Sequence, residues 1–291
     1  MSNVNRPRTA ARTDLPVPGD ARADDHGPGV ARPPLPRRLL AEGVGTALLV
    51  TVVVGSGIAA QRLSPDDVGL QLLQNSTATV LGLAVLILVF GPVSGAHFNP
   101  VVSAVDWFLG RRTGAGLPAR DLPAYTAAQV AGAIAGAVLA NAMYALPAVD
   151  ISTKDRASWS AGLSEVVATA GLIAVIFALA RTGRGALSAA AVGAYIGAAY
   201  WFTSSTSFAN PAVTIGRVFS DTFAGIAPTS VPAFVTAQVV GAAIGLALVL
   251  ALYPDLTTPD GAAAAADNAV AADLGTSPTT SPTPAPQQET R

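Results

Sequence analysis

Long apolar segments are the feature that most constrains how this chain can fold. Of its 291 residues, 51% are hydrophobic and only 12% are charged, whereas soluble domains have roughly 25% charged residues. A helix needs about 20 apolar residues to cross a bilayer. Spans are expected at about 39–60, 70–90, 122–146, 159–179, 186–202 and 231–253. The sequence therefore predicts an all-α membrane protein that crosses the bilayer six times.

The composition excludes several other classes of protein. The chain has no cysteine, which excludes disulfides, thiolate metal sites and a cysteine nucleophile. Its net charge is -1 and it has a single lysine, so nothing indicates nucleic-acid binding. No nucleophile, metal cluster or acid–base pair converges, so we expect neither an enzyme nor a cofactor or metal site. The polar ends are predicted to be a disordered N-terminal arm at 1–36 and a disordered Ala/Pro/Thr-rich tail at 254–291.

Two Asn-Pro pairs each open an apolar run that is too short to span the bilayer. Asparagine is a favoured helix N-cap, because its side-chain oxygen can accept a free backbone N–H of the first turn. Proline suits the first helical position, where its missing N–H has no partner to lose. We therefore expect two half-helices inside the membrane, at 99–108 and 210–219. They open with two triplets of residues, which are Asn99, Pro100 and Val101, and Asn210, Pro211 and Ala212.

The two half-helices belong to an internal duplication. A glutamate (Glu42 and Glu165), a half-helix, and a later Ala-Gln-Val motif recur in the same order in the two halves. Each half has three spans, which is an odd number, so the second half enters the membrane from the opposite side. The expected boundaries of these inverted repeats are 37–146 and 147–253. Inverted repeats with broken helices place a solute site near the bilayer midplane.

The meeting point of the two half-helices indicates what can pass there. Their N-termini carry the positive ends of two helix dipoles. Non-helical backbone at that depth is tolerated only where it lines a wet cavity or is buried in protein. Loop carbonyls can accept hydrogen bonds from a neutral hydroxylated solute, and Asn99 and Asn210 can donate to it, whereas cations meet a positive barrier. A lone Asn-Pro pair would favour a simple cap, but the duplicated pair favours pore lining.

The basic residues predict the orientation of the chain. If the N-terminus is cytoplasmic, 13 of the 17 lysine and arginine residues lie inside, in agreement with the positive-inside rule. The four that lie outside are Arg62, Lys154, Arg156 and Arg217. We therefore expect a multi-pass protein of the cell (plasma) membrane with both termini cytoplasmic.

The spans, the repeat and the paired motifs together resemble the major intrinsic protein family, the aquaporins and aquaglyceroporins, over about residues 39–253. The resemblance implies an aquaporin-like inverted repeat of six transmembrane helices plus two re-entrant half-helices. It also implies one pore per subunit and a homotetramer in the lipid bilayer. The expected activity is passive transport of water or small neutral solutes, without a cofactor.

The chain departs from the family pattern at two positions. Val101 stands where the family usually has alanine. Val213 stands where water-selective members, and most glycerol-conducting ones, have an arginine. Arg217 lies one turn further along, on a similar helix face, and the sequence leaves open whether it reaches the pore.

By family alignment, the narrow selectivity filter would consist of Thr79, Ala198, Ser207 and Val213. All four are small or medium-sized and none is charged, which predicts a wide, weakly polar filter that admits solutes larger than water. The stretch 194–217 also looks like a bacterial branch that often accompanies arsenic-resistance genes. The resemblance therefore implies glycerol-like polyols and neutral metalloid hydroxides such as arsenite, while residue chemistry alone indicates a small neutral solute.

Three polar residues near the predicted pore each have two interpretations. Glu42 and Glu165 lie deep in spans, where a carboxylate is a candidate proton relay. The resemblance favours hydrogen bonds to the re-entrant loops instead, because buried carboxylates need donors. His97 can titrate near neutrality and act as a pH gate, although a hydrogen-bonded loop histidine is favoured. A water-selective aquaporin, a proton-coupled secondary transporter and a non-conducting junction protein remain as alternatives.

Overall fold

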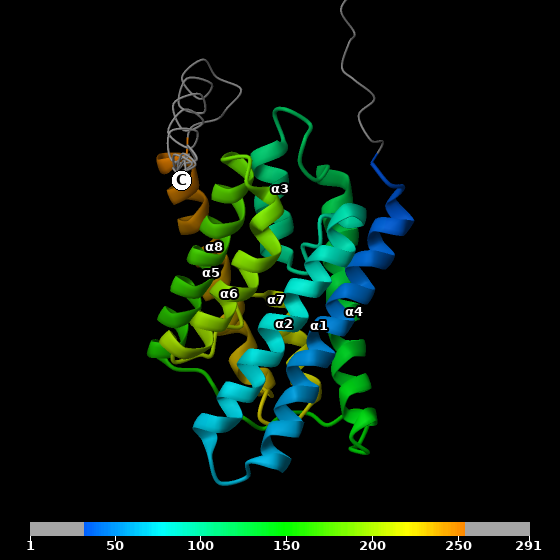
Figure 1. Ribbon diagram of the computed structural model, residues 1–291, viewed down its shortest axis with the longest axis vertical. Helices are drawn as coiled ribbons and strands as arrows, with labels where there is room; N and C mark the ends of the chain where they lie inside the picture. Colours follow the sequence, from blue (N-terminus) through cyan, green and yellow to red (C-terminus); the bar gives the residue numbers. More distant parts are fainter. Residues whose placement is uncertain (1–31, 254–291) are drawn as a thin grey trace, which may run out of the picture. The chain divides into compact units, whose positions relative to one another are not determined.

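The computed structural model describes residues 32–253, and its first helix, α1, begins at Leu35 (Figure 1). The predicted tail and residues 1–31 of the predicted arm lie outside the described residues. The predicted end of the arm at 36 is wrong, because Leu35 and Pro36 already belong to α1. Proline is tolerated in the first turn of a helix, where the missing N–H would have no partner.

Within residues 32–253, six long helices are apolar enough to cross a membrane, as the sequence predicts. Short 3-10 turns lead into three of them, and no β-strand occurs within residues 32–253. The described part of the chain is therefore all-α. The six are α1 (Leu35–Leu63), α2 (Val68–Ser94), α4 (Leu122–Met143), α5 (Trp159–Arg181), α6 (Ser188–Phe202) and α8 (Val231–Leu252).

Two short helices lie between the long ones. α3 (Pro100–Gly110) and α7 (Pro211–Gly216) both begin at the proline of an Asn-Pro pair. In Figure 1, α7 lies at mid-height among the long helices. The second half-helix is shorter than expected as an α-helix, since a 3-10 turn (Arg217–Phe219) follows it. α2 continues beyond the expected end of its span at 90, until Gly95 adopts a left-handed conformation with φ 92°, so the loop before α3 begins at Gly95.

Glycines bring the long helices of each half into close contact. α1 packs on α4, and α5 packs on α8. An added Cβ atom at Gly132 of α4 would collide with the Gly43 carbonyl of α1. At Gly241 of α8 it would collide with the Val166 carbonyl of α5. Small residues let helix backbones approach closely in lipid. This close glycine contact recurs at matching places in the two halves.

We expect Gly132→Ala to lower the melting temperature of the purified protein. The new methyl group would meet backbone atoms of Gly43, and overpacking of this kind costs about 1–3 kcal/mol. Gly162 of α5 is the matched control, since nothing lies within 4 Å of an added Cβ atom there. Alanine at that position raises helix propensity by roughly 1 kcal/mol, so Gly162→Ala should not lower the melting temperature. An equal fall in both variants would contradict this packing argument.

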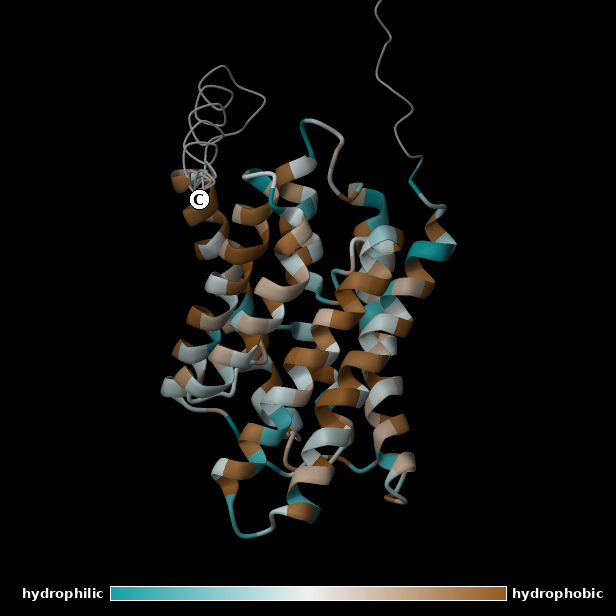
Figure 2. Ribbon diagram, in the orientation of Figure 1, coloured by the Kyte–Doolittle hydropathy of each residue, from teal (hydrophilic) through white to brown (hydrophobic). Residues whose placement is uncertain are grey.

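The outward faces of the helices are apolar. Leu81, Val85 and Leu88 of α2 are 63%, 57% and 63% exposed. Figure 2 shows hydrophobic residues along the helices and hydrophilic residues mainly in the connections between them. Contiguous apolar surface of this extent marks a membrane-facing or protein-facing surface, and here it accompanies helices long enough to span. The described bundle is therefore a multi-pass membrane domain.

Candidate functional site

Each asparagine of the two triplets caps its own half-helix. The Asn99 side-chain oxygen accepts a hydrogen bond from the Val101 N–H (3.1 Å). The Asn210 oxygen accepts from the N–H groups of Ala212 (2.9 Å) and Val213 (3.2 Å). Both asparagines have an extended backbone, which is the usual N-cap geometry. Both residues are thus helix caps.

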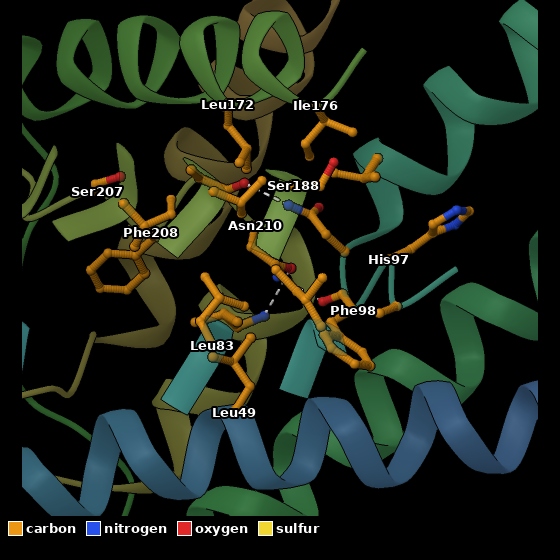
Figure 3. Close-up of a pocket in the computed structure, with 18 of the residues that line it drawn as sticks. Leu49, Leu83, His97, Phe98, Leu172, Ile176, Ser188, Ser207, Phe208 and Asn210 are labelled. Carbon is orange, nitrogen blue, oxygen red and sulfur yellow. Dashed lines mark hydrogen bonds between the residues drawn. The ribbon is translucent and has the colours of Figure 1, made fainter. Parts of the chain in front are cut away.

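The same two asparagines also join the two re-entrant loops to each other. The Asn99 side-chain N–H donates to the Ala209 carbonyl (2.8 Å), and the Asn210 side-chain N–H donates to the Phe98 carbonyl (2.7 Å). Figure 3 labels Asn210 and Phe98 in the middle of the site and marks hydrogen bonds there with dashed lines. A side-chain amide has two N–H donors, so each asparagine keeps a second donor. The structure therefore brings Asn99 and Asn210 together in the wall of one cavity.

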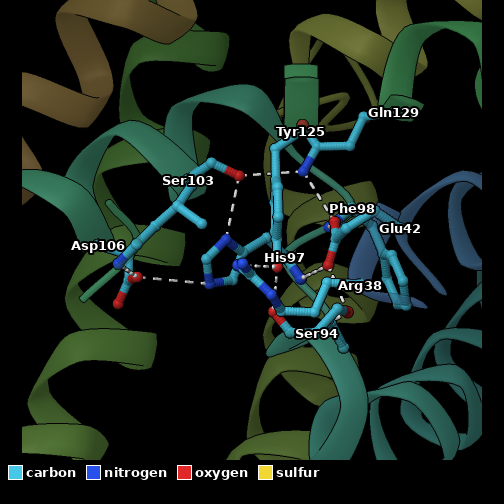
Figure 4. Close-up of polar contacts among 11 residues, drawn as sticks. Arg38, Glu42, Ser94, His97, Phe98, Ser103, Asp106, Tyr125 and Gln129 are labelled. Carbon is cyan, nitrogen blue, oxygen red and sulfur yellow. Dashed lines mark hydrogen bonds and ion pairs between the residues drawn. The ribbon is translucent and has the colours of Figure 1, made fainter. Parts of the chain in front are cut away.

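Glu42 of α1 holds the first re-entrant loop in place. Its side chain is fully buried. It accepts four hydrogen bonds, from Ser94 Oγ (2.6 Å), the His97 N–H (3.0 Å), the Phe98 N–H (2.7 Å) and Gln129 Nε2 (2.8 Å) (Figure 4). Each carboxylate oxygen receives two of these bonds, so the buried charge is well satisfied.

Glu165 of α5 has the equivalent place at the second loop. It is also fully buried. It accepts hydrogen bonds from the Phe208 N–H (2.9 Å), the Ala209 N–H (2.8 Å) and Gln238 Nε2 (2.7 Å). The glutamines that complete both networks were visible in the sequence only as part of the repeated Ala-Gln-Val motif. Their role as donors follows from the structure.

Both loops contain residues in the left-handed conformation, which residues other than glycine rarely adopt. The φ angle is 50° at Ala96 and Phe98 in the first loop and 49° at Ser207 and Ala209 in the second. Backbone strain of this kind persists only where the surrounding structure fixes it. The two buried glutamates provide that support by accepting loop N–H groups. Every hydrogen bond that the two carboxylates accept comes from a re-entrant loop, from Ser94 or from a glutamine.

His97 is held at both ring nitrogens. Its Nδ1 lies 3.0 Å from the Ser103 hydroxyl, and its Nε2 lies 3.8 Å from the Asp106 carboxylate (Figure 4). The ring centroid lies 5.7 Å from that of Tyr125. His97 is thus a hydrogen-bonded loop residue, and together with Asp106 it lines the cavity.

The cavity has a volume of about 310 Å³ and includes both asparagines in its lining. Its walls are mainly aliphatic, with side chains such as Leu49 of α1 and Leu172 of α5 (Figure 3). Figure 3 shows Ser207 on one side of Asn210 and His97 on the other. In a mostly apolar cavity, a few placed polar groups decide how a small ligand is oriented.

The expected filter is only partly assembled. Thr79, Ser207 and Val213 line the cavity, but Ala198 does not. Ala198 is exposed on the outside of α6. Tyr200 is found in the cavity wall instead: it is 3% exposed, and its hydroxyl lies 3.2 Å from Thr79 Oγ1.

Helix periodicity explains this correction. Residues four positions apart share one face of a helix, and Val192, Ile196 and Tyr200 of α6 all line the cavity. Ala198 is two positions from Ile196 and so lies on nearly the opposite face. Ala198 is thus not among the residues that line this cavity, and Tyr200 of the same helix is. The cavity wall therefore has a bulky tyrosine beside Thr79, whereas the four residues expected at the filter are small or medium-sized.

Arg217 reaches the cavity, a point that the sequence left open. Its side chain is 2% exposed and lines the same cavity as Val213. Its guanidinium carbon lies 3.4 Å from the centroid of the Phe208 ring, and its Nε donates to the Ala224 carbonyl. An arginine is thus present in the wall although position 213 has none. The only signal for this in the sequence was the spacing of one helical turn.

These features define a class of membrane channel. Within residues 32–253, four of the six spans (α1, α2, α5 and α6) line a cavity, and two half-helices from the two halves of the chain meet there at their N-terminal caps. A model of the major intrinsic protein family matches residues 30–207. The chain belongs to the major intrinsic protein family, whose members are channels and not enzymes.

Individual relatives agree with this assignment. The chain is 53% identical over 203 residues to the aquaglyceroporin AqpS of Rhizobium meliloti, which covers 70% of this chain and 84% of the relative. It is 34% identical over 227 residues to the glycerol uptake facilitator protein of Pseudomonas aeruginosa, covering 67% and 78% of the two chains. The X-ray structure of the aquaglyceroporin from Plasmodium falciparum shares the fold, with a TM-score of 0.57 and 21% identity over 74% of this chain and 96% of that one.

Proposed function

We propose that this protein is a passive channel for small uncharged solutes: glycerol-like polyols, water, and neutral metalloid hydroxides such as arsenite. One observation carries the proposal. Asn99 and Asn210 each donate across to the opposite re-entrant loop, and both line one cavity. Each keeps a second N–H for a passing hydroxyl group. The names of two relatives, an aquaglyceroporin and a glycerol uptake facilitator, support the solute class.

Charged solutes are unfavourable in this cavity. Aliphatic walls cannot replace the hydration shell of an ion, so entry of a charge is costly. The N-terminal ends of α3 and α7 carry positive partial charge toward the asparagines, and Arg217 adds a full positive charge in the wall. Cations, including protons, therefore meet a barrier.

A water-selective channel is the second candidate, and two residues favour it. Tyr200, which lies beside Thr79, and Arg217 both line the cavity, and a bulky aromatic residue with an arginine narrows a passage more than the expected filter would. Val213 favours the broader selectivity, because the wall next to Asn210 stays apolar and uncharged there. We propose that Thr79, Tyr200, Ser207 and Val213 form the filter.

Stopped-flow light scattering on proteoliposomes tests the choice between them. We expect water and glycerol to cross at rates well above those of protein-free vesicles, and arsenite influx to rise as well. A transmembrane pH gradient should leave all three rates unchanged, because no step moves a proton. Water flux without glycerol or arsenite flux would establish the second candidate, and flux driven by the pH gradient would establish a coupled transporter.

We also propose that the protein is a homotetramer in the plasma membrane, with both termini cytoplasmic and with inverted repeats at 37–146 and 147–253. The excess of lysine and arginine on one side supports this orientation. The exposed apolar faces of the helices offer surface for both lipid and neighbouring subunits. Mass measurement of the protein in detergent micelles checks the tetramer. Labelling of single introduced cysteines in intact cells checks the orientation of the termini.

A further inference from the structure

Three cations gather around two phenylalanine rings, and two members of this cluster, Arg217 and Phe208, line the cavity. The guanidinium carbons of Arg217 and Arg156 lie 3.4 Å and 5.3 Å from the centroid of the Phe208 ring. Lys154 Nζ lies 5.2 Å from the centroid of the Phe223 ring. Lys154 and Arg156 also donate to the same Phe223 carbonyl, at 3.1 Å and 2.9 Å. These shared partners place three positive charges in one small region.

The cluster has no counter-ion of its own. Within residues 32–253, no carboxylate forms an ion pair with Lys154, Arg156 or Arg217. Asp221 attracts Lys154 through space, but its oxygens accept from hydroxyl and amide groups of the adjacent loop. Glu165 attracts both arginines through space, but its oxygens are engaged by the second re-entrant loop and a glutamine.

The pKa of Lys154 reflects the neighbouring positive charges. Partial burial, together with repulsion from Arg156 and Arg217, lowers the pKa of Lys154 to about 8. Burial lowers the pKa of Arg156 to about 10. An anion placed nearby would favour the charged form of each group. The electrostatics of the cluster therefore favour a bound anion.

Arg217 also has hydrogen-bond donors that the protein does not use. A guanidinium group has five N–H donors. Among the residues that the structure describes, only its Nε has an acceptor, the Ala224 carbonyl. Arg217 is 2% exposed and lines the cavity, so donors without a protein acceptor lie at the cavity wall. A group that accepts hydrogen bonds from these charged donors would be stabilised there.

We propose that Arg217 and Arg156 form a binding site for a small oxyanion beside Phe208, where Arg217 lines the cavity. Arg156 Nε and Nη2 already donate to the Gly225 and Phe223 carbonyls. The paired donors that fit carboxylate or phosphate oxygens therefore come from Arg217, and Arg156 adds charge. Lys154, which is exposed, adds charge that attracts such an anion from solution. A bound oxyanion at this place obstructs one end of the solute path. That last consequence rests on the proposed channel function, whereas the binding itself does not.

Calorimetric titration of the purified protein with inorganic phosphate tests the binding. The wild-type chain should show saturable binding that equimolar chloride does not reproduce. Arg217→Gln and Arg156→Gln should each weaken it at least tenfold. Arg217→Lys keeps the charge but loses the fork, and should also weaken it; this variant guards against misfolding of the glutamine variant. Wild-type protein that does not bind phosphate, or folded variants that bind as tightly as wild type, would overturn the proposal.

Arg62→Gln is the matched control. Arg62 is another arginine of the side predicted to be outside, and it lies over an aromatic ring and donates to a backbone carbonyl, but both belong to Tyr144. Its loss should leave phosphate binding unchanged. A loss of binding equal to that in Arg156→Gln would show that general surface charge, and not this site, holds the anion, and would overturn the proposal.

Flux measurements test the position of the site. External phosphate should slow glycerol influx into wild-type proteoliposomes, with half-inhibition near the calorimetric dissociation constant, and Arg156→Gln should need at least tenfold more phosphate. Binding without inhibition would refute the location in the solute path. If glycerol does not cross at all while phosphate still binds, the channel proposal fails and the oxyanion site stands.

Discussion

Glu165→Gln will reduce glycerol and water flux at least tenfold and lower the melting temperature of the purified protein. The wild-type carboxylate accepts from the N–H groups of Phe208 (2.9 Å) and Ala209 (2.8 Å) and from Gln238 Nε2 (2.7 Å). A glutamine at this position offers one oxygen and turns an NH2 group toward at least one of these donors. Each buried donor left without an acceptor costs about 1–3 kcal/mol.

The loss of flux follows from the strain in the loop. Ser207 and Ala209 have φ angles of 49°, and such backbones relax when their hydrogen bonds are removed. Because Asn99 donates to the Ala209 carbonyl, relaxation of this loop displaces the contact between the two half-helices. The solute path is then distorted at its centre, although residue 165 itself does not line the cavity.

Two companion variants make this result specific. Glu42→Gln should cause a loss of similar size, because Glu42 supports the first loop with four hydrogen bonds. Asp155→Asn, at a carboxylate that is exposed and accepts from Ser230, should have little effect. Stopped-flow rates and melting curves are the readouts. Wild-type rates and melting temperature in Glu165→Gln would refute the support role. If Glu165→Gln loses only the part of the flux that a pH gradient drives, Glu165 acts as a proton relay instead.

The sequence predicted the architecture well because its strongest signals are local. Long apolar segments fix the six spans, and an Asn-Pro pair fixes the start of each half-helix whatever packs around it. The symmetric positions of Glu42 and Glu165 led to their interpretation as loop anchors, since a buried carboxylate must find donors. These inferences need only composition, caps and a repeat.

The cavity lining was harder to predict because it depends on the rotation of helices. Ala198 and Tyr200 are only two positions apart on α6, yet only Tyr200 lines the cavity. Nothing in the apolar sequence of α6 marks which of its faces points inward. Arg217 reaches the cavity because its guanidinium lies over Phe208 and its Nε finds the Ala224 carbonyl. The reciprocal bonds of the two asparagines join residues more than 100 positions apart, and no local pattern encodes them.

Val213→Arg will reduce glycerol and arsenite flux at least tenfold, while water flux falls less. Val213 lies in the first turn of α7, its N–H donates to Asn210, and its side chain lines the cavity. An arginine there takes up space in a cavity of only about 310 Å³. It also adds a second positive charge to the wall that Arg217 already occupies, and like charges repel strongly where water is scarce. Larger solutes lose their path first, because water needs the least room.

Val213→Met separates bulk from charge in that result. Methionine adds length without a charge and adapts to irregular space, so its flux should lie between those of wild type and Val213→Arg. Melting curves check that both variants fold, because Val213 lines the cavity but is also only 5% exposed and belongs to the hydrophobic core. If Val213→Arg assembles normally and glycerol and arsenite cross at wild-type rates, residue 213 is not part of the filter, and selectivity must then reside with Tyr200 and Thr79.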